Sequence, residues 1–402
     1  MPLYKCINLD QSNSTIVKED TQDGTTTVDI ISATESINAS AYKNWIACIY
    51  NDGEGVTELP EWGDYIGDYA FAHCTQLALT ELPQGVTTIG DHAFDSCENL
   101  SITDFPGSVS SIGDYAFQFC TSLKDLYLPS DLEYLGSYAF YYCSNMSLVT
   151  IIPETLTYWG SMPFEGTNVR IGNIPSNVTS FGYAPFSGVT LNMTPDDFPK
   201  SITSIPSGFF TGCTMSWEYL PSTITDLSSN SFSGVKGLND ITIDVDQFTS
   251  LSLPSYAFSN CPDLEYVRFP GGSTLEFEIG DYCFAECSSF LYAQINSSVA
   301  KIGNFAFQNC SKMEEIYIPE CVTSIGYNAF DKCSSLKKVS FQADDCANYA
   351  NLTMSNIFSN CNNITEIYVN WSKDNDRENG GVITLWKNNY LPNATVTFEA
   401  GC

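Results

Sequence analysis

The sequence has few basic residues. Lys and Arg number 16 against 47 Asp and Glu, which gives a formal net charge of −31. Nucleic-acid binding is therefore not expected, because phosphate contacts need clustered positive charge. An anionic membrane surface would also repel this chain. The negative charge favours partners with cationic patches, or divalent cations, as ligands.

Histidine is almost missing as well, with only His73 and His92 present. His73 precedes a recurring cysteine, whereas His92 occupies a place that tyrosine takes in neighbouring copies, so the two fall on different parts of adjacent repeats. A Ser-His-Asp or Cys-His site would need its third member by coincidence. No phosphate-binding glycine loop and no CxxC pair is present. We expect no enzyme, no catalytic or metal-binding residue and no cofactor.

Carboxylates are paired in several places, as expected in so acidic a chain. Asp196-Asp197 and Asp344-Asp345 are predicted loop pairs, whereas acid–base catalysis needs a buried carboxylate in a pocket. The segment 374–380 has acidic groups at alternate positions, like a calcium loop. However, its glycine falls one residue late and the twelfth position is not acidic. We interpret this segment as a solvated polar loop.

Long apolar runs are absent too. No stretch has the apolar length that spans a bilayer, so no membrane insertion is expected. The first residues lack the basic start and apolar run of a secretory signal. Two interpretations stay open: the chain was trimmed, or it is assembled inside a cell and leaves by another route. Virion assembly followed by lysis is such a route.

What the sequence does contain is a repeat. The same short sequence motif, which ends in phenylalanine, occurs thirteen times, and its best-matching copies are 66–71, 89–94 and 112–117. Between the edges the motif recurs about every 23 residues, and a period of about 20–29 residues is the signature of a leucine-rich-repeat solenoid. The series comprises Phe71, Phe94, Phe117, Phe140, Phe164, Phe186, Phe210, Phe232, Phe258, Phe284, Phe307, Phe330 and Phe358.

One copy, 120–143, shows what the repeat is made of. Its leucines over 123–128 predict a short strand, which Pro129 ends. Gly136 allows a sharp turn on the return path, and Ser137 lies where a helix N-cap belongs, so one or two helical turns are predicted after it. The same capping position holds Asp68, Asp91, Asp114, Ser255, Asp281 and Asn304.

No repeat of this size can bury its apolar face alone. Stacking places successive repeats about 4.8 Å apart and gives a continuous core. We therefore expect the phenylalanines to form a buried aromatic spine.

Ten of the 16 cysteines occupy one repeat position. Either they form an exported disulfide framework or they are a ladder of buried thiols. We favour buried thiols, because Thr167, Val189 and Val235 replace cysteine without compensation. The ten are Cys74, Cys97, Cys120, Cys143, Cys213, Cys261, Cys287, Cys310, Cys333 and Cys361. The sequence alone assigns no pairing to the others, which are Cys6, Cys48, Cys283, Cys321, Cys346 and Cys402.

This repeat motif resembles that of the BspA-like branch of the leucine-rich-repeat superfamily. The resemblance rests on Leu-x-x-Ile-x-Leu-Pro-x-x-Val-x-x-Ile-Gly-x-x-Ala-Phe-x-x-Cys, nearly whole from Met313 to Cys333, and covers roughly 56–370. It implies an α/β solenoid of about 13 repeats with short strands and short helical turns, capped at both ends. The family implies adhesion or protein binding at exposed surfaces, in bacteria, some protists and phage-encoded relatives, without enzymatic activity as a class.

Three parts of the chain are predicted. Residues 1–55 lack the repeat and are an N-terminal cap or an attachment segment, with a β-like apolar stretch at 45–50. Residues 56–370 form the solenoid. Residues 371–402 form a C-terminal cap, in which 393–398 alternates like a closing edge strand.

Tyrosines and charged residues alternate with the buried positions of the predicted strands. Such a face suits protein or glycan recognition, although aromatic residues also stabilise a sheet across strands. The row comprises Glu81, Asp104, Tyr127, Arg268, Gln294, Tyr317, Ser340 and Tyr368, with Tyr266, Tyr292, Glu315, Lys338 and Glu366 beside it. The residues predicted to bind a ligand are Tyr127, Tyr266, Arg268, Tyr292, Tyr317 and Tyr368.

We therefore predict a non-enzymatic binding protein that presents its repeat surface to a host cell, a glycan or a partner protein. The favoured setting is a phage virion, as a fibre or decoration component, with residues 1–55 able to contact other virion proteins. The alternatives are a bacterial or protist adhesin at the cell surface and a purely structural assembly subunit.

Overall fold

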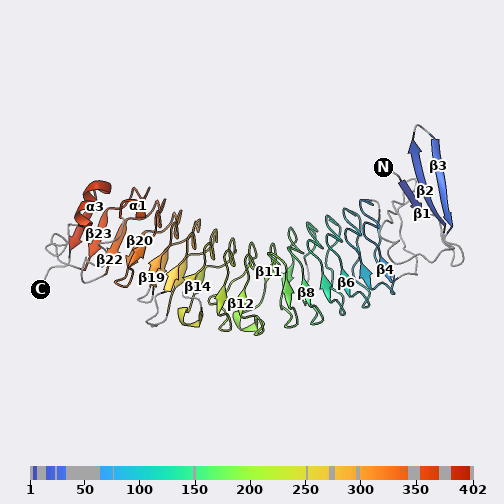
Figure 1. The fold of residues 1–402 in the computed structure, drawn as a ribbon, viewed down its shortest axis with the longest axis horizontal. Coiled ribbons are helices and arrows are strands. Elements are labelled where there is room, and N and C mark those ends of the chain that lie inside the picture. Colours follow the sequence, from blue (N-terminus) through green and yellow to red (C-terminus); the bar gives the residue numbers. More distant parts are fainter. Residues whose placement is uncertain are drawn as a thin grey trace. The chain divides into compact units, whose positions relative to one another are not determined.

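The structure is a computed structural model of two compact units, Met1–Met193 and Thr194–Cys402, which are described separately. Figure 1 shows the strands of each unit stacked along the chain. The residues described are 3–6, 15–22, 25–32, 64–75, 77–147, 151–249, 252–270, 277–295, 299–342, 354–370 and 382–398, the first three stretches by their backbone alone. They include about 11 stacked turns, close to the number predicted.

The first unit combines a small antiparallel sheet, β1-β2-β3, with stacked parallel strands of two residues each. Consecutive repeats supply the parallel sheet β10-β8-β7-β6-β5-β4, and β11 pairs with β9. The strands are β1 (Leu3–Cys6), β2 (Thr15–Gln22), β3 (Thr25–Ser32), β4 (Tyr65–Ile66), β5 (Thr88–Ile89), β6 (Ser111–Ile112), β7 (Tyr134–Leu135), β8 (Tyr158–Trp159), β9 (Arg170–Ile171), β10 (Ser180–Phe181) and β11 (Thr190–Leu191).

The second unit has longer strands in two rows. One row consists of the parallel sheets β14-β16-β18 and β20-β22-β23-β24, and the other of β12-β13 and β15-β17-β19-β21. The strands are β12 (Ser204–Ile205), β13 (Asp226–Leu227), β14 (Asp240–Thr242), β15 (Ser252–Leu253), β16 (Tyr266–Arg268), β17 (Phe277–Ile279), β18 (Tyr292–Gln294), β19 (Val299–Ile302), β20 (Glu315–Ile318), β21 (Ser324–Ile325), β22 (Lys338–Phe341), β23 (Glu366–Val369) and β24 (Thr395–Phe398). Its helices are η2 (Pro195–Asp197), η3 (Val245–Gln247), α1 (Met354–Ile357) and α3 (Val382–Tyr390).

The sequence predicts a strand at the position of 123–128 in each repeat. This prediction is wrong for the repeats of the first unit and right for those of the second. In the first unit this row holds an isolated bridge between Asp104 and Tyr127, and the ladder forms instead on the return path, at β7. In the second unit the inward residues of the row include the β-branched Val267, Ile316 and Val339. Branched side chains favour the extended backbone, which accounts for the longer strands there.

The helical turns predicted after each glycine are not formed. The segment is a chain of tight turns in which Tyr138 (φ 56°) and Tyr142 (φ 54°) are left-handed. The Tyr138 N–H donates to the Ser161 carbonyl at 2.8 Å, and the Phe140 N–H donates to the Pro163 carbonyl at 2.8 Å. Alternate N–H groups therefore pair with the next repeat, and the left-handed residues interrupt any run of helical dihedrals.

The predicted N-caps act across repeats instead of within one. Asp91 Oδ1 accepts from the Asp114 N–H at 2.8 Å, and Asp114 Oδ1 accepts from the Ser137 N–H at 2.6 Å. Each side chain thus satisfies the backbone donor at the equivalent position of the following repeat. Gly136 is required by close approach, because a Cβ there would overlap the backbone of Gly113.

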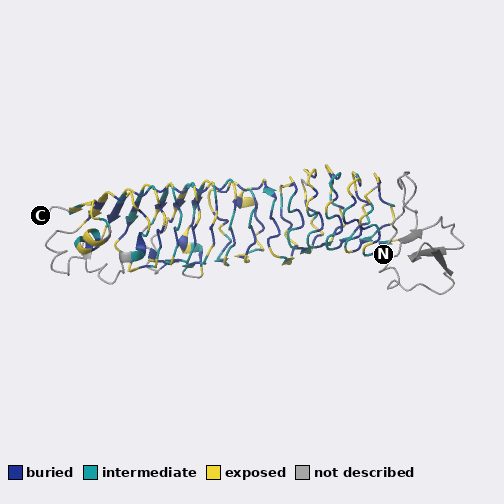
Figure 2. Cartoon of the chain, turned by 90° about the horizontal axis from the view of Figure 1, so that it is seen from above, coloured by how far each residue is buried: buried dark blue, intermediate teal, exposed yellow. Residues whose placement is uncertain are grey.

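The predicted aromatic spine is confirmed within each unit. In the first unit Phe117 stacks on Phe94 and on Phe140, with ring centroids 5.2 Å apart in both pairs. In the second, Phe307 stacks on Phe284 at 5.3 Å and on Phe330 at 5.2 Å. All six rings are fully buried, and Figure 2 shows buried positions recurring from repeat to repeat.

The recurring cysteines form the predicted ladder of buried thiols. The Cys120 thiol donates to the Phe94 carbonyl and the Cys143 thiol to the Phe117 carbonyl, both at 3.0 Å. Burial raises the pKa of both thiols above the ordinary value of 9.0, so they stay protonated at neutral pH. At the same position the Thr167 hydroxyl donates to a carbonyl of its own repeat. The described cysteines with free thiols include Cys120, Cys143, Cys213, Cys261, Cys283, Cys287, Cys310, Cys333 and Cys361.

The last described residues continue the packing of the second unit. Trp386 of α3 is 4% exposed and contacts Phe358 at a ring distance of 5.3 Å. The closing strand predicted over 393–398 is present as β24, which pairs in parallel with β23. The predicted divisions at 55 and 370 stay predictions. The expected apolar stretch 45–50, the pair Asp344-Asp345 and the loop 374–380 lie outside the described residues.

Candidate functional site

Five of the six residues predicted to bind a ligand lie on the outward faces of two successive sheets in one row of the second unit. Tyr266 and Arg268 are outward residues of β16, Tyr292 of β18, Tyr317 of β20 and Tyr368 of β23. Because side chains of a strand alternate between faces, the buried residues between them hold this row outward. The sixth residue, Tyr127, is 54% exposed and belongs to the first unit.

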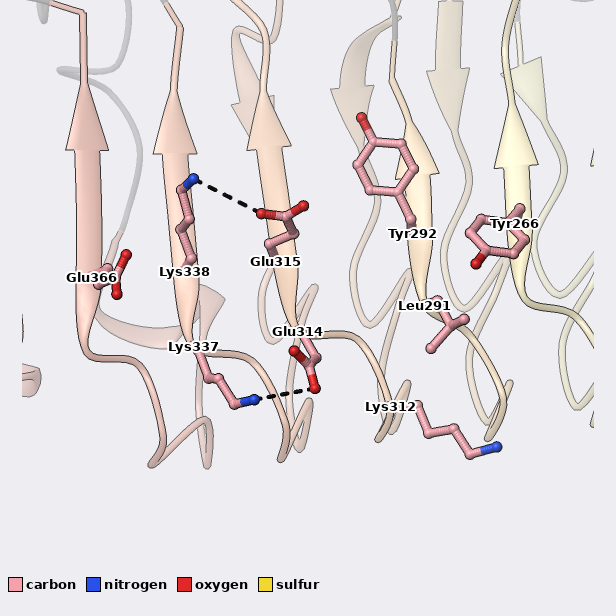
Figure 3. Close-up of a pocket in the computed structure, with 9 residues that line it drawn as sticks. All are labelled: Tyr266, Leu291, Tyr292, Lys312, Glu314, Glu315, Lys337, Lys338 and Glu366. Atoms are coloured by element: carbon pink, nitrogen blue, oxygen red, sulfur yellow. Dashed lines mark ion pairs between the residues drawn. The ribbon is translucent and has the colours of Figure 1, made fainter.

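A groove opens where the two sheets of this row meet. No backbone ladder joins β18 to β20 in the described residues, although the Tyr292 and Tyr317 rings touch edge to face at 6.1 Å. The groove has a volume of about 620 Å³ and runs across the beginnings of five strands. We call it the tyrosine–lysine groove; its lining is Tyr266, Leu291, Tyr292, Lys312, Glu314, Glu315, Lys337, Lys338 and Glu366 (Figure 3).

Charges of both signs alternate along this groove. Lys337 Nζ lies 3.1 Å from Glu314 and Lys338 Nζ lies 3.9 Å from Glu315. Lys312 Nζ contacts the Ser289 hydroxyl at 3.4 Å, and Figure 3 shows its side chain directed away from Glu314. Exposed pairs of this kind contribute about 0–1 kcal/mol, so a ligand can replace them at low cost.

Lys338, on β22, also contacts tyrosine rings on the two adjacent strands, β20 and β23. Its Nζ lies 4.6 Å from the centre of the Tyr368 ring and 5.6 Å from that of Tyr317, within the range of cation–π attraction. Ser340, between those two tyrosines in register, is 6% exposed. The prediction that Ser340 faces solvent is therefore wrong, because its large neighbours cover it.

The phenol groups of the face are held in place by local contacts. The Tyr317 hydroxyl donates to Glu315 Oε2 at 3.0 Å. Partial burial, helped by Tyr317 and Glu315, raises the pKa of Tyr292. Its hydroxyl therefore remains a hydrogen-bond donor at neutral and mildly alkaline pH. Tyr266 is 36% exposed.

Arg268 is placed differently from its predicted role. Its Nη1 binds both carboxylate oxygens of Asp240 on β14, at 2.6 and 2.7 Å. It is not among the lining residues of the groove. Its guanidinium therefore bridges two strands beside the groove.

Sequence reasoning missed Lys312, Lys337 and Glu314 as members of the site. Their signal is visible in hindsight. Five of the 16 basic residues of this acidic chain fall between 301 and 338. Nothing in the repeat pattern shows that the sheet is interrupted between β18 and β20, and this interruption brings the lysines to a groove.

The two histidines occupy separate settings. His92 lies between the rings of Tyr69 at 4.6 Å and Tyr115 at 4.7 Å, and its Nδ1 is 2.9 Å from Asp95. His73 is exposed on the preceding repeat. The predicted separation of the two is confirmed.

Two carboxylates of the groove are exposed and paired with lysines. Glu314 and Glu315 are 64% and 44% exposed and face ammonium groups, whereas acid–base catalysis uses buried carboxylates. Asp197, from one predicted pair, accepts from the Thr194 hydroxyl at 2.7 Å and caps a short turn. The described side chains hold no metal-ligating cluster, and no helix of the described chain has the length and apolarity of a membrane span.

With this geometry established, the comparisons identify the repeat. The sequence matches the BspA type leucine rich repeat region in six copies, over residues 64–192, 189–276 and 251–375. The chain belongs to the BspA-type leucine-rich-repeat family. Such BspA-type repeats form the stacked parallel strands of both units, and no curated protein matches the sequence.

Solved structures of leucine-rich-repeat proteins share the fold. A protein from Bacteroides ovatus has a TM-score of 0.64 and 22% identity, covering 85% of this BspA-type chain and 83% of its own. A cell surface protein from Faecalibacterium prausnitzii has 21% identity and a TM-score of 0.42, covering 94% of this chain and 97% of its own. The pneumococcal vaccine antigen PcpA has 15% identity and a TM-score of 0.46, covering 99% and 100%. Because the last two TM-scores lie below 0.5, we draw nothing from them.

Proposed function

We propose that the chain is a non-enzymatic adhesion protein of a cell surface, and that its tyrosine–lysine groove binds a glycan. The observation that carries this proposal is the groove itself, an open hollow of about 620 Å³ lined by tyrosines, ammonium groups and carboxylates. The placement is supported by membership of the BspA-type family, whose members imply surface-exposed binding. The phage-virion setting stays a prediction.

The chemistry of the lining favours a sugar over a protein surface. Tyr266 and Tyr292 are paired in register on adjacent strands, and the C–H face of a pyranose ring packs well on a tyrosine ring. Glu314 and Lys337 present acceptors and donors suited to hydroxyl groups. Protein hot spots instead centre on desolvated apolar pockets, and Leu291 is the one aliphatic residue in the lining.

The lysines further favour a sugar that carries a carboxylate. Three of the chain's 16 basic residues line this one groove, and Lys312 has a hydroxyl rather than a carboxylate as its partner. At physiological salt, charges more than about 8 Å away are largely screened. The three lysines and three glutamates of the lining cancel, so the groove lacks the net negative charge of the whole molecule, and Lys312 is left to pair with a ligand carboxylate.

Glycan binding by purified variants tests the proposal. Tyr292→Ala and Lys312→Ala should each weaken binding to immobilised uronic- or sialic-acid glycans by about tenfold, or ~1.4 kcal/mol. Tyr183→Ala is the matched control, since this tyrosine is 52% exposed and lies in the other unit. Unchanged binding in both groove variants would refute the groove. Loss of cell adhesion after protease treatment of the cells, but not after glycan removal, would show a protein ligand instead.

A further inference from the structure

The first unit carries a second surface, formed by interlocked aromatic rings on its turns. Tyr141 contacts Tyr142 at 4.6 Å, Tyr138 at 5.3 Å and Phe119 at 6.0 Å, all edge to face. Phe119 and Tyr142 touch at 5.8 Å and are 39% and 46% exposed. We call these residues, with Tyr115 stacked on Tyr138 at 4.8 Å, the aromatic cluster. Exposed groups of large rings mark interaction sites.

The backbone under this cluster is unusual for aromatic residues. Phe119 (φ 57°) and Tyr142 (φ 54°) occupy the position two residues after the spine phenylalanine, which is left-handed. Gly166 and Gly188 take the same position in the next two repeats, with φ of 76° and 75°. Bulky side chains are disfavoured in this conformation. The left-handed backbone itself belongs to the repeat, since Ser96 (φ 61°) and Asn260 (φ 56°) adopt it at the same position. Nothing in the repeat requires exposed aromatic side chains there.

The rings are fixed before any partner arrives. Tyr142 lies against Gly166, where an added Cβ would come within 2.9 Å of the ring. Tyr138 is held between Tyr115 and Tyr141. A rigid surface loses little conformational entropy on binding.

The surroundings of the cluster are acidic. Residues 64–193 contain thirteen Asp and Glu, against only Lys124 and Arg170. Glu165 follows directly beside the cluster, and its carbonyl accepts from the Tyr142 N–H at 2.7 Å. Its Oε2 is buried without a hydrogen-bond partner in the described structure. That oxygen is closed to a partner from outside, so Glu165 acts on this surface through its negative charge. The charge lies close enough to help raise the pKa of Tyr141, after burial and Tyr142.

We propose that the aromatic cluster and Glu165 bind arginine side chains of a partner protein. A guanidinium group stacks on tyrosine rings and pairs with carboxylates, which matches both features of this surface. A second copy of this chain is disfavoured as the occupant, because each copy carries a net charge of −31. This surface lies in the other unit from the groove, so the two proposals stand or fall separately.

The test removes the rings without disturbing the fold. The double variant Phe119→Ser with Tyr142→Gly introduces the residue types that neighbouring repeats have at this position, namely Ser96 (φ 61°) and Gly166. The variant should be at least as stable as the wild type in thermal unfolding. Its affinity for a fluorescein-labelled arginine–glycine repeat peptide, measured by anisotropy at physiological salt, should fall by about tenfold. Glu165→Gln should weaken the same binding.

Two comparisons separate specific binding from bulk attraction. A lysine–glycine peptide of equal length and charge should bind the wild type more weakly, since lysine lacks the planar guanidinium. Tyr183→Ser, which removes an exposed ring elsewhere in the unit, should leave arginine-peptide binding unchanged. Equal binding by the double variant and the wild type overturns the proposal. So does a wild-type dimer in sedimentation that the double variant abolishes, because the occupant is then a second copy.

Discussion

Buried and exposed residues alternate closely within one repeat, so substitutions a few residues apart should differ sharply. Phe307 is fully buried between Phe284 and Phe330. Phe307→Ala should lower the free energy of unfolding by about 3–5 kcal/mol, through lost burial and the cavity that remains. Tyr317→Ala, on the following strand, is the matched control and should change stability by about 0.5 kcal/mol or less. Urea unfolding followed by circular dichroism measures both, and similar losses would place the Phe307 ring outside the core.

Glycines of the repeat should respond to alanine according to the space around them. Gly136→Ala should destabilise the protein, because the added Cβ would overlap the backbone of Gly113 in the preceding repeat. Gly107→Ala meets its nearest atom, Ser130 Oγ, only at 3.8 Å. It should therefore be neutral or stabilise by about 0.4–1 kcal/mol, as a compatible Gly→Ala change does. Thermal unfolding of the two variants is the measurement, and a stable Gly136→Ala protein would contradict the tight stacking.

At the scale of single elements, the sequence predicts what repeats at fixed spacing and fails where neighbouring repeats decide. The spine, the thiol ladder and the row of β16, β20 and β23 follow from the position of apolar residues within the period. The segment after Gly136 has inward residues at helical spacing, and its capping serine fits a helix start. Only the neighbouring repeat's carbonyls reveal that its N–H groups pair across repeats. The groove was missed for the same reason, since it depends on an interrupted ladder between β18 and β20.

The thiol ladder should make the protein sensitive to alkali. Burial raises the pKa of Cys120, Cys143, Cys213, Cys310 and other ladder thiols above the ordinary value of 9.0. The unfolded chain then releases thiol protons above that value while the folded chain keeps them. Stability is therefore intact below about pH 9 and falls as pH rises, by about 1.4 kcal/mol per pH unit for each such thiol. Urea midpoints measured across this range, under reducing conditions, should show the decline.

A single-site variant isolates the contribution of the thiols. Cys143→Val removes one titrating group and installs the residue that Val189 and Val235 already provide at this position. The alkaline slope of stability should decrease by the share of one thiol, about 1.4 kcal/mol per pH unit. Cys321→Val is the comparison, since that thiol is only partly buried; burial raises its pKa as well, so its removal should reduce the slope over a narrower pH range. An unchanged slope for Cys143→Val would mean that alkaline loss comes from other groups.

For the whole molecule, the net charge of −31 dominates. The folded state holds its carboxylates closer together than the unfolded chain does, so self-repulsion favours unfolding. Raising ionic strength from about 0.01 M to about 0.15 M shortens the screening length from about 30 Å to about 8 Å. We therefore expect Tm to rise over this range of sodium chloride concentration, measured by differential scanning calorimetry at neutral pH.

The choice of salt shows whether screening is the cause. Calcium chloride at the same ionic strength should give the same Tm if screening alone acts. A larger rise would show calcium bound to the folded chain, since a ligand of the folded state stabilises it by mass action. Sucrose at equal osmolality leaves the charges unscreened and should not reproduce the salt dependence at low ionic strength. A Tm that stays constant or falls in sodium chloride would mean that close pairs such as Lys337 with Glu314 already compensate the acidic surface.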